Sequence, residues 1–156
     1  MRLDLIVNAM IKAAITEGII TVNNPSIWRP ILDIRDAASA YICAVEANYH
    51  ISGIFNIAIG NFTVGEAADY VREEVREHLG INAKLNIKHI DDARNYKVSV
   101  EKARNTLSFN PKFHVKDIVK NLAENMDYFK DIENPNYYNI KVFKQIDKER
   151  SFVGVG

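Results

Sequence analysis

The spacing of hydrophobic residues divides the chain into alternating helical and strand-like segments. Apolar side chains recur every three or four positions in several stretches, which predicts helices at about 4–17, 37–48, 64–79, 100–107 and 115–132. Shorter apolar or alternating runs predict strands at 19–22, 31–34, 53–58 and 83–90. Short strands interleaved with helices indicate a small mixed α/β fold, with too few strand–helix–strand units for a complete doubly wound sheet.

Individual residues mark where several of these helices begin and end. Gly18 and Gly80 each follow a helical stretch and predict that the helix stops there. Asp36 stands just before the second helix and is expected to cap it, which is a structural role. Thr63 and Glu66 match a capping box, in which the Thr hydroxyl accepts from the third helical amide and the Glu reaches back.

The periodic pattern weakens from residue 133 onward. Pro135 and the tyrosines at 137–138 predict an extended segment docked on the body, whereas 144–150 is polar and expected to be solvated. We therefore expect a domain at 1–132 and a partly docked C-terminal extension at 133–156.

Composition narrows the classes of function. Lys and Arg total 20 and Asp and Glu total 20, so the formal net charge is zero and favours neither nucleic acid nor an anionic membrane as a partner. The apolar runs are shorter than the roughly 20 residues that a membrane-spanning helix needs. Cys43 is the single cysteine, which excludes a disulfide framework, and its apolar neighbours indicate a packing residue. The expected compartment is a reducing cytoplasm.

Several catalytic and cofactor signatures are missing from the sequence. The glycines form neither the strand–helix turn that holds a dinucleotide pyrophosphate nor a Walker loop. The histidines are too widely spaced for a helical metal site. Tyr137 and Lys141 have the spacing of a reductase Tyr–Lys pair, but we expect no catalytic role because no cofactor-binding stretch precedes them. We predict no catalytic, cofactor-binding or metal-binding residue in this chain.

Three stretches, in this order and spacing, carry a resemblance to a known family. They are RLDLIVNAM at 2–10, WRPILDIRDAASA at 28–40, and RNYKVS at 94–99 followed by Lys102, Leu107, Phe109 and Pro111. With the strand-like run at 54–57 and the Thr63–Glu66 box, they resemble the C-terminal, substrate-binding half of extended short-chain dehydrogenase/reductases. These are NAD-dependent sugar-nucleotide epimerases and dehydratases, such as UDP-glucose 4-epimerase and dTDP-glucose 4,6-dehydratase. The resemblance covers roughly residues 2–125.

The resemblance implies a nucleotide-sugar site between this half and a Rossmann half that binds NAD. Asn8, Arg29 and Arg94 match family positions that meet the sugar diphosphate, and Arg suits a diphosphate because it is permanently charged and can bind bidentately. The alternative for Arg29 is a surface side chain stacked on Trp28. Asp33 departs from the His of many relatives, and could pair with Arg35 or weaken phosphate binding.

Two kinds of function remain open at this point. In the first, the chain is the substrate-binding part of an NAD-dependent epimerase or dehydratase whose catalytic Ser/Thr, Tyr and Lys lie upstream, so the isolated chain is expected to be inactive. In the second, it is a non-catalytic binding or assembly module that associates with a separate Rossmann subunit or with itself, or a truncated gene product. A missing partner predicts an exposed apolar surface, expected on the first helix around Leu5, Ile6 and Met10.

Overall fold

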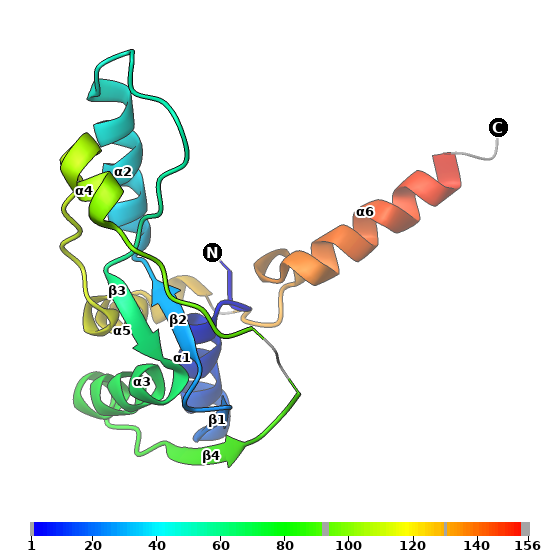
Figure 1. The fold of residues 1–156 in the computed structure, drawn as a ribbon. Coiled ribbons are helices and arrows are strands. Elements are labelled where there is room, and N and C mark those ends of the chain that lie inside the picture. The colour runs from blue at the N-terminus through cyan, green and yellow to red at the C-terminus, as the bar shows by residue number, and fades with distance from the viewer. Residues whose placement is uncertain (1, 92–93, 130, 154–156) are drawn as a thin grey trace.

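The computed structural model describes residues 2–91, 94–129 and 131–153 (Figure 1). Its elements, in chain order, are α1 (Ile6–Glu17), β1 (Ile19–Asn23), β2 (Trp28–Ile31), α2 (Ile34–Glu46), β3 (Gly60–Thr63), α3 (Val64–Leu79), β4 (Lys84–Lys88), α4 (Glu101–Leu107), α5 (Val115–Glu124), the 3-10 helices η1 (Met126–Phe129) and η2 (Pro135–Tyr137), and α6 (Asn139–Val153). The predicted small mixed α/β fold is confirmed. Among the described residues the strands form a parallel pair, β1 with β4, and an antiparallel pair, β2 with β3.

The helix boundaries that single residues predicted are confirmed for α1 and α3. Gly18 and Gly80 both adopt a left-handed conformation, with φ of 65° and 68°, and each donates its amide back into the preceding helix. Positive φ is open to glycine at little cost, so glycine ends a helix sharply at these positions. Thr63 and Glu66 form the capping box at the start of α3, with Glu66 accepting from the Thr63 amide at 2.7 Å.

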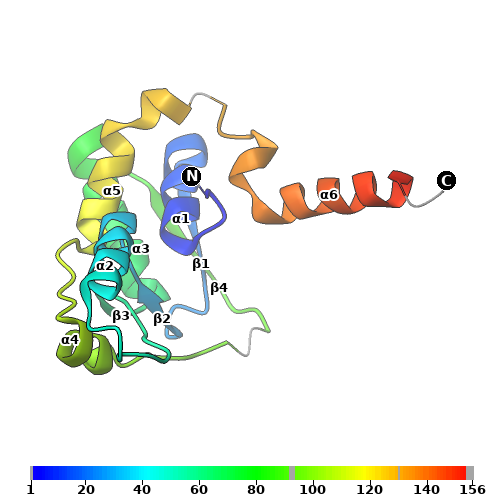
Figure 2. The ribbon, with the colours of Figure 1, turned by 90° about the horizontal axis from the view of Figure 1, so that it is seen from above.

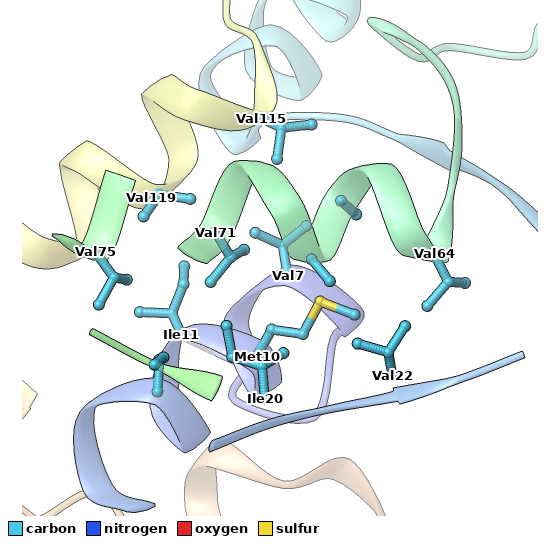
Figure 3. Close-up of a cluster of buried hydrophobic side chains, with 14 of the residues drawn as sticks. Val7, Met10, Ile11, Ile20, Val22, Val64, Val71, Val75, Val115 and Val119 are labelled. Carbon is cyan, nitrogen blue, oxygen red and sulfur yellow. The ribbon is translucent and has the colours of Figure 1, made fainter. Parts of the chain in front are cut away.

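The larger hydrophobic core lies where α1, α3 and α5 pack together over the parallel strands (Figure 3). β1 alternates exposed and buried residues, so Ile20 and Val22 point into this core while their neighbours face outward. Ile11 from α1 and Val71 and Val75 from α3 fill the space between the helices and are almost fully buried. The helices of this core have their apolar sides covered, whereas on β4 Leu85 is partly buried and Ile87 is 57% exposed.

A smaller cluster joins α2 and α4 at the other end of the molecule (Figure 1). Its buried residues are few, and two of the four are alanines: Ala40, Ala103, Leu107 and Phe109. Partly buried side chains from the segment before β3, such as Phe55 and Ile57, complete it, and Cys43 packs there as well.

Two buried carboxylates fix the position of α2. Asp33 is the N-cap and accepts from the Arg35 amide at 2.8 Å, so the prediction that Asp36 caps this helix is wrong. The carboxylate of Asp36 is 1% exposed and accepts from the backbone amides of Lys112, at 2.9 and 3.0 Å, and Phe113, at 2.9 Å. Asp36 is structural, as expected, but it ties α2 to the segment before α5.

Two of the predicted strands are placed wrongly. The strand expected at 31–34 lies at 28–31, because Asp33 begins the next helix. The strand expected at 53–58 does not form: 54–58 runs without a sheet partner in the described part of the chain. Its apolar pattern comes from packing of Phe55 and Ile57 into the smaller cluster, and no neighbouring strand is there to pair with its backbone.

The C-terminal part differs from its expected form. The helix predicted at 115–132 ends at residue 124 and is followed by the short helix η1. Residues 135–137 form a 3-10 turn rather than an extended segment, and Tyr137 accepts from the Leu3 amide at 2.9 Å. The polar stretch after it belongs to α6, which projects from the body in both views (Figures 1 and 2).

Four exposed large apolar side chains lie on α2, whereas none of those described lies on α1 between Ile6 and Glu17. Met10 is only 5% exposed because it packs against β1 and α3 in the larger core, and Ile6 is partly buried there. Leu5 is the one expected residue that is well exposed, at 46%. The expectation about α1 is therefore largely wrong: its apolar side is already covered within this chain.

Candidate ligand-binding site

Two of the three predicted site residues lie next to one another. Arg29 is on β2, and Arg94 begins the stretch that runs toward α4. The guanidinium of Arg29 donates from Nη1 to the carbonyl oxygen of Arg94, 65 residues away in the chain, and to the carbonyl of Trp28 at 2.8 Å. Arg29 therefore helps to hold the two cationic residues at one place on the surface.

Paired hydrogen bonds attach the 94–98 segment along the small antiparallel sheet. The Trp28 amide donates to Asn95 Oδ1 at 2.9 Å, which fixes the N-terminal end. The side-chain amide of Asn61 on β3 donates to the Val98 carbonyl and accepts from the Val98 amide, both at 2.9 Å. These contacts give the segment a defined register against β2 and β3.

Aromatic rings and a third cation surround the two arginines. The guanidinium carbon of Arg29 lies 5.5 Å from the ring centre of Tyr96, and the ammonium of Lys97 lies 3.5 Å from that of Trp28. The alternative placed Arg29 over the Trp28 ring. The structure places Lys97 over that ring and Arg29 beside the ring of Tyr96. Tyr96 is 51% exposed, so part of its ring faces solvent beside Arg29.

Tyr96 and Lys97 were missed as site residues from the sequence. The available signal was their position two and three residues after Arg94, in a short stretch with two cations and one aromatic residue. We call the group Arg29, Arg94, Tyr96, Lys97 and Trp28 the arginine–aromatic cluster.

Asn8 belongs to a different local network. It lies on α1, and its side-chain amide donates to the Arg2 carbonyl at 2.7 Å. This bond holds the segment before α1 and does not join Asn8 to the arginine–aromatic cluster.

Two acids of the described residues, Asp33 and Glu66, already have partners. Asp33 binds the guanidinium of Arg35 through both carboxylate oxygens, at 2.9 and 2.8 Å. Burial opposes its charged form, but the hydrogen bonds and positive charge of Arg35 outweigh that effect and hold the pKa of Asp33 below its usual value. Hydrogen bonds from the Thr63 backbone and hydroxyl lower the pKa of Glu66, and the charge of Lys97 adds to this. Asp33 thus pairs with Arg35. This is one of the two outcomes expected for an Asp at a position where many relatives have His.

The arrangement suits binding of an anion more than acid–base chemistry. Its charged members are cations, and guanidinium groups donate to phosphate oxygens without taking part in proton transfer. Within 2–91, 94–129 and 131–153, no three His, Cys, Asp or Glu residues are grouped as a metal site. At the C-terminal end, Lys141 lies over the ring of Tyr138, 4.2 Å from its centre, and 3.9 Å from Glu133.

A shallow depression of about 440 Å³ lies elsewhere on the surface. Its lining residues come from α3 and the following loop: Asp69, Arg72, Glu73, Arg76, Asn82 and Ala83. Arg72 is paired with Asp69 at 2.9 Å on an exposed helical face. The depression does not include the arginine–aromatic cluster, and we attribute it to solvated side chains along α3.

Comparison with solved structures places the fold. The chain aligns with UDP-glucuronic acid 4-epimerase from Bacillus cereus at a TM-score of 0.68 and 16% identity, over 82% of this chain and 41% of that one. ADP-L-glycero-D-manno-heptose-6-epimerase from Helicobacter pylori aligns at 0.63 and 16%, over 78% and 37%. L-threonine dehydrogenase from Phytophthora infestans aligns at 0.64 and 17%, over 79% and 41%. No family model matches the chain. No curated protein matches it either.

These similarities show the fold and how much of each neighbour's chain it matches. The chain is similar to part of epimerases and dehydrogenases that use this architecture, and it spans about two fifths of their length. At this level of identity the substrate does not follow, since these neighbours include a UDP-glucuronic acid epimerase and an L-threonine dehydrogenase. Within the described residues, no helix has the length and apolarity needed to cross a membrane.

Proposed function

We propose that this chain is the nucleotide-sugar-binding part of an NAD-dependent epimerase or dehydratase. In this proposal Arg29 and Arg94 hold the diphosphate, and Asn8 contributes from α1. The observation that carries it is the direct hydrogen bond from the Arg29 guanidinium to the Arg94 backbone, which brings the two residues together although they are 65 positions apart in the chain. A diphosphate spreads charge over several oxygens, and neighbouring guanidinium forks match that distribution better than isolated lysines do.

The aromatic rings of the cluster suit the remainder of such a ligand. Tyr96 presents part of its ring beside Arg29, and flat heteroaromatic rings stack on such faces. A ligand held by phosphate and base together would be fixed in orientation, which is how a substrate-binding part contributes to rate.

The chain's own residues do not fit NAD. The strand–helix turn that a dinucleotide would need has its nearest counterpart between β3 and α3. There the Val64 amide donates to Ile27 at 3.0 Å, the Gly65 amide to Pro25 at 2.9 Å, and the capping box takes the Thr63 and Glu66 amides. A side-chain carbon at Gly65 would lie 3.2 Å from the Pro25 carbonyl oxygen, so no space for a pyrophosphate remains at this helix end.

NAD binding and hydride transfer therefore fall to another polypeptide region in this proposal. A separately encoded Rossmann subunit is the partner of choice, because β1 and β4 form only a two-stranded parallel sheet within the described residues, and its outer edges can accept further strands. The isolated chain is then inactive but able to bind the nucleotide sugar. Nucleic acid and membranes are not part of the proposal, since the formal net charge is zero.

The second candidate is a binding or assembly module whose ligand has no nucleotide. The similarity to L-threonine dehydrogenase supports this second candidate, because that protein has a similar fold and a small amino-acid substrate. A ligand of that kind would not need the paired arginines, so the two candidates make opposite predictions for variants of Arg29.

Thermal shift assays with the purified chain test the proposal. UDP-, GDP-, CDP- and dTDP-sugars, L-threonine and NAD are each added at about 100 times the dissociation constant, where bound ligand adds about 2.7 kcal/mol. For a domain of this size we expect a rise of about 5–10 °C with one nucleotide sugar. Arg29→Ala or Arg94→Ala should remove the shift, and Arg72→Ala, on the far depression, is the matched control. A shift with NAD alone, or with L-threonine alone, would contradict the proposal.

A further inference from the structure

Three members of the arginine–aromatic cluster come from one short stretch, residues 94–98, which we call the ligand segment. In Figure 1 the chain leaves β4 and runs past β2 to α4, so this stretch follows the parallel pair of strands and reaches the antiparallel pair. Neither Ile90 nor the ligand segment belongs to a strand. The backbone here lacks the ladder of hydrogen bonds that fixes β4, so side chains have to hold the cluster in place.

The side chain of Asn61 holds the C-terminal end of the ligand segment. Its amide nitrogen donates to the Val98 carbonyl, and its oxygen accepts from the Val98 amide, both at 2.9 Å. Asparagine can do both because its side chain carries a donor and an acceptor next to each other, as a peptide group does. Asn61 lies on β3, in register with Pro30 of β2, so this two-point bridge attaches the segment to the antiparallel pair.

The side chain of Asn24 makes the same kind of bridge on the other side of Arg94. Its oxygen accepts from the Ile90 amide at 3.0 Å, and its nitrogen donates to the Ile90 carbonyl at 2.7 Å. The backbone amide of Asn24 also donates to the Lys88 carbonyl at 2.8 Å, just beyond the last paired residues of β1 and β4. The chain is therefore gripped by one asparagine before the ligand segment and by another at its end.

The backbone conformation of Asn24 shows that its side chain matters. Its φ is 51°, a left-handed value that Ser108 alone shares among the described residues other than glycine. Glycine adopts this conformation more easily than any other residue, and asparagine only tolerates it. The turn by itself would thus favour glycine at this position, and what asparagine adds is the pair of hydrogen bonds to Ile90.

We propose that Asn24 and Asn61 are positioning residues for the arginine–aromatic cluster. Each grips the backbone on one side of Arg94, and neither belongs to the cluster. A ligand that needs several groups together binds only the molecules in which they are together, so its apparent dissociation constant rises as that fraction falls. The proposal rests on the proposed function for the identity of the ligand, but the positioning itself is measurable without one.

The fluorescence of Trp28 tests the positioning in the ligand-free chain. Trp28 is the single tryptophan, and the ammonium of Lys97 lies 3.5 Å from its ring centre, so its emission responds to the place of the segment. Lys97→Gln gives the emission of the ring without its cation. Asn61→Ala should shift the emission toward that reference. Asn125→Ala is the matched control, because Asn125 donates to the carbonyl of Asn121 within one turn of chain, and it should leave the emission unchanged.

Two replacements of Asn24 separate positioning from stability. Asn24→Gly removes the bridge and relieves the left-handed backbone, so its melting temperature should stay within about 3 °C of the wild type. Asn24→Ala removes the bridge and keeps the backbone strain, so it should melt lower. Both should speed hydrogen exchange in residues 94–98 and raise the dissociation constant for inorganic pyrophosphate roughly tenfold, as measured by titration calorimetry. A residue with a structural role alone would lose affinity only in step with the melting temperature.

Two results would overturn the proposal. One is wild-type emission and exchange in Asn61→Ala, which would mean that other contacts hold the ligand segment. The other is wild-type exchange in Asn24→Gly, with pyrophosphate affinity lost only in the less stable Asn24→Ala. If the wild-type chain does not bind pyrophosphate, the diphosphate part of the proposed function fails, while the emission of Trp28 and the exchange rates still decide whether the two asparagines position the cluster.

Discussion

The two hydrophobic clusters are built in the same chain with very different degrees of completion. In the larger one, α1 is packed against α3, α5 and β1, and residues such as Val71 and Ile11 have no more than 1% of their surface exposed. In the smaller one, α2 has a covered inner side and an exposed outer side, and only four residues of the cluster are buried. The contrast teaches that an apolar helical pattern predicts a buried face, but it does not say whether this chain or another supplies the cover.

The same substitution placed in each region gives the largest expected difference. Val71→Asp puts an unpaired carboxylate into the closed core and should cost more than about 4 kcal/mol, enough to leave the chain unfolded. Val45 is exposed on α2, so Val45→Asp should change the stability of the monomer by about 0.5 kcal/mol or less. Urea unfolding at low protein concentration measures both. Equal losses of stability would show that the two positions are equally closed to solvent.

Asp36 joins the two regions, so its removal should separate them. Asp36→Ala leaves the amides of Lys112 and Phe113 without their buried acceptor and should lower the stability of the α2–α4 part by roughly 3 kcal/mol. Hydrogen exchange should then show faster exchange in α2 and α4 while α1 and α3 stay protected. Uniform acceleration in all four helices would mean that the chain opens as one unit.

Acid should weaken the smaller region through its helix cap. The pKa of Asp33 is lowered in the folded chain, so its stabilising effect is present above the unfolded value of about 3.9 and is lost as pH falls through the folded value. We expect the melting temperature to drop below about pH 4, and Asp33→Asn should reduce this drop. Glu66→Gln is the companion variant in the larger region, where the pKa of Glu66 is also lowered at an exposed capping box. An unchanged acid profile in Asp33→Asn would assign the sensitivity to other carboxylates.

The smallest effect is expected from the projecting helix. Removing residues 139–156 takes away α6 but leaves the hydrogen bond between Leu3 and Tyr137 in place. The melting temperature should change by less than about 2 °C, since Ile140 and Phe143 are 66% and 61% exposed and contribute little to either cluster. A loss of several degrees would show that α6 packs on the body in solution.

The sequence predicted best where the signal is local. Gly18, Gly80 and the Thr63–Glu66 box act within one turn of a helix, and the structure places all of them as expected. The cap of α2 was missed by three positions because Asp33 and Asp36 both precede good helical residues. Only the distant amides at 112–113 distinguish their roles.

Long-range partners were beyond a reading of the sequence. An apolar run such as 53–58 has the same appearance whether it pairs in a sheet or packs as a single extended segment, so its predicted strand was wrong. For the candidate site, Arg29 and Arg94 came from a family resemblance, and their contact across 65 residues is known only from the fold. Tyr96 and Lys97 joined them because hydrogen bonds to Trp28 and Asn61 fix that segment against the sheet.

The attachment of the C-terminal segment to α1 has a consequence for biosynthesis. Lys12 on α1 donates to Glu133, 121 residues later, and to the Tyr138 hydroxyl at 2.7 Å. A ribosome adds about 5–20 residues per second, so α1 waits about 6–24 s after its synthesis for these contacts. During that interval the side of α1 that these late residues contact stays uncovered in the nascent chain, where chaperones or proteases can bind to it.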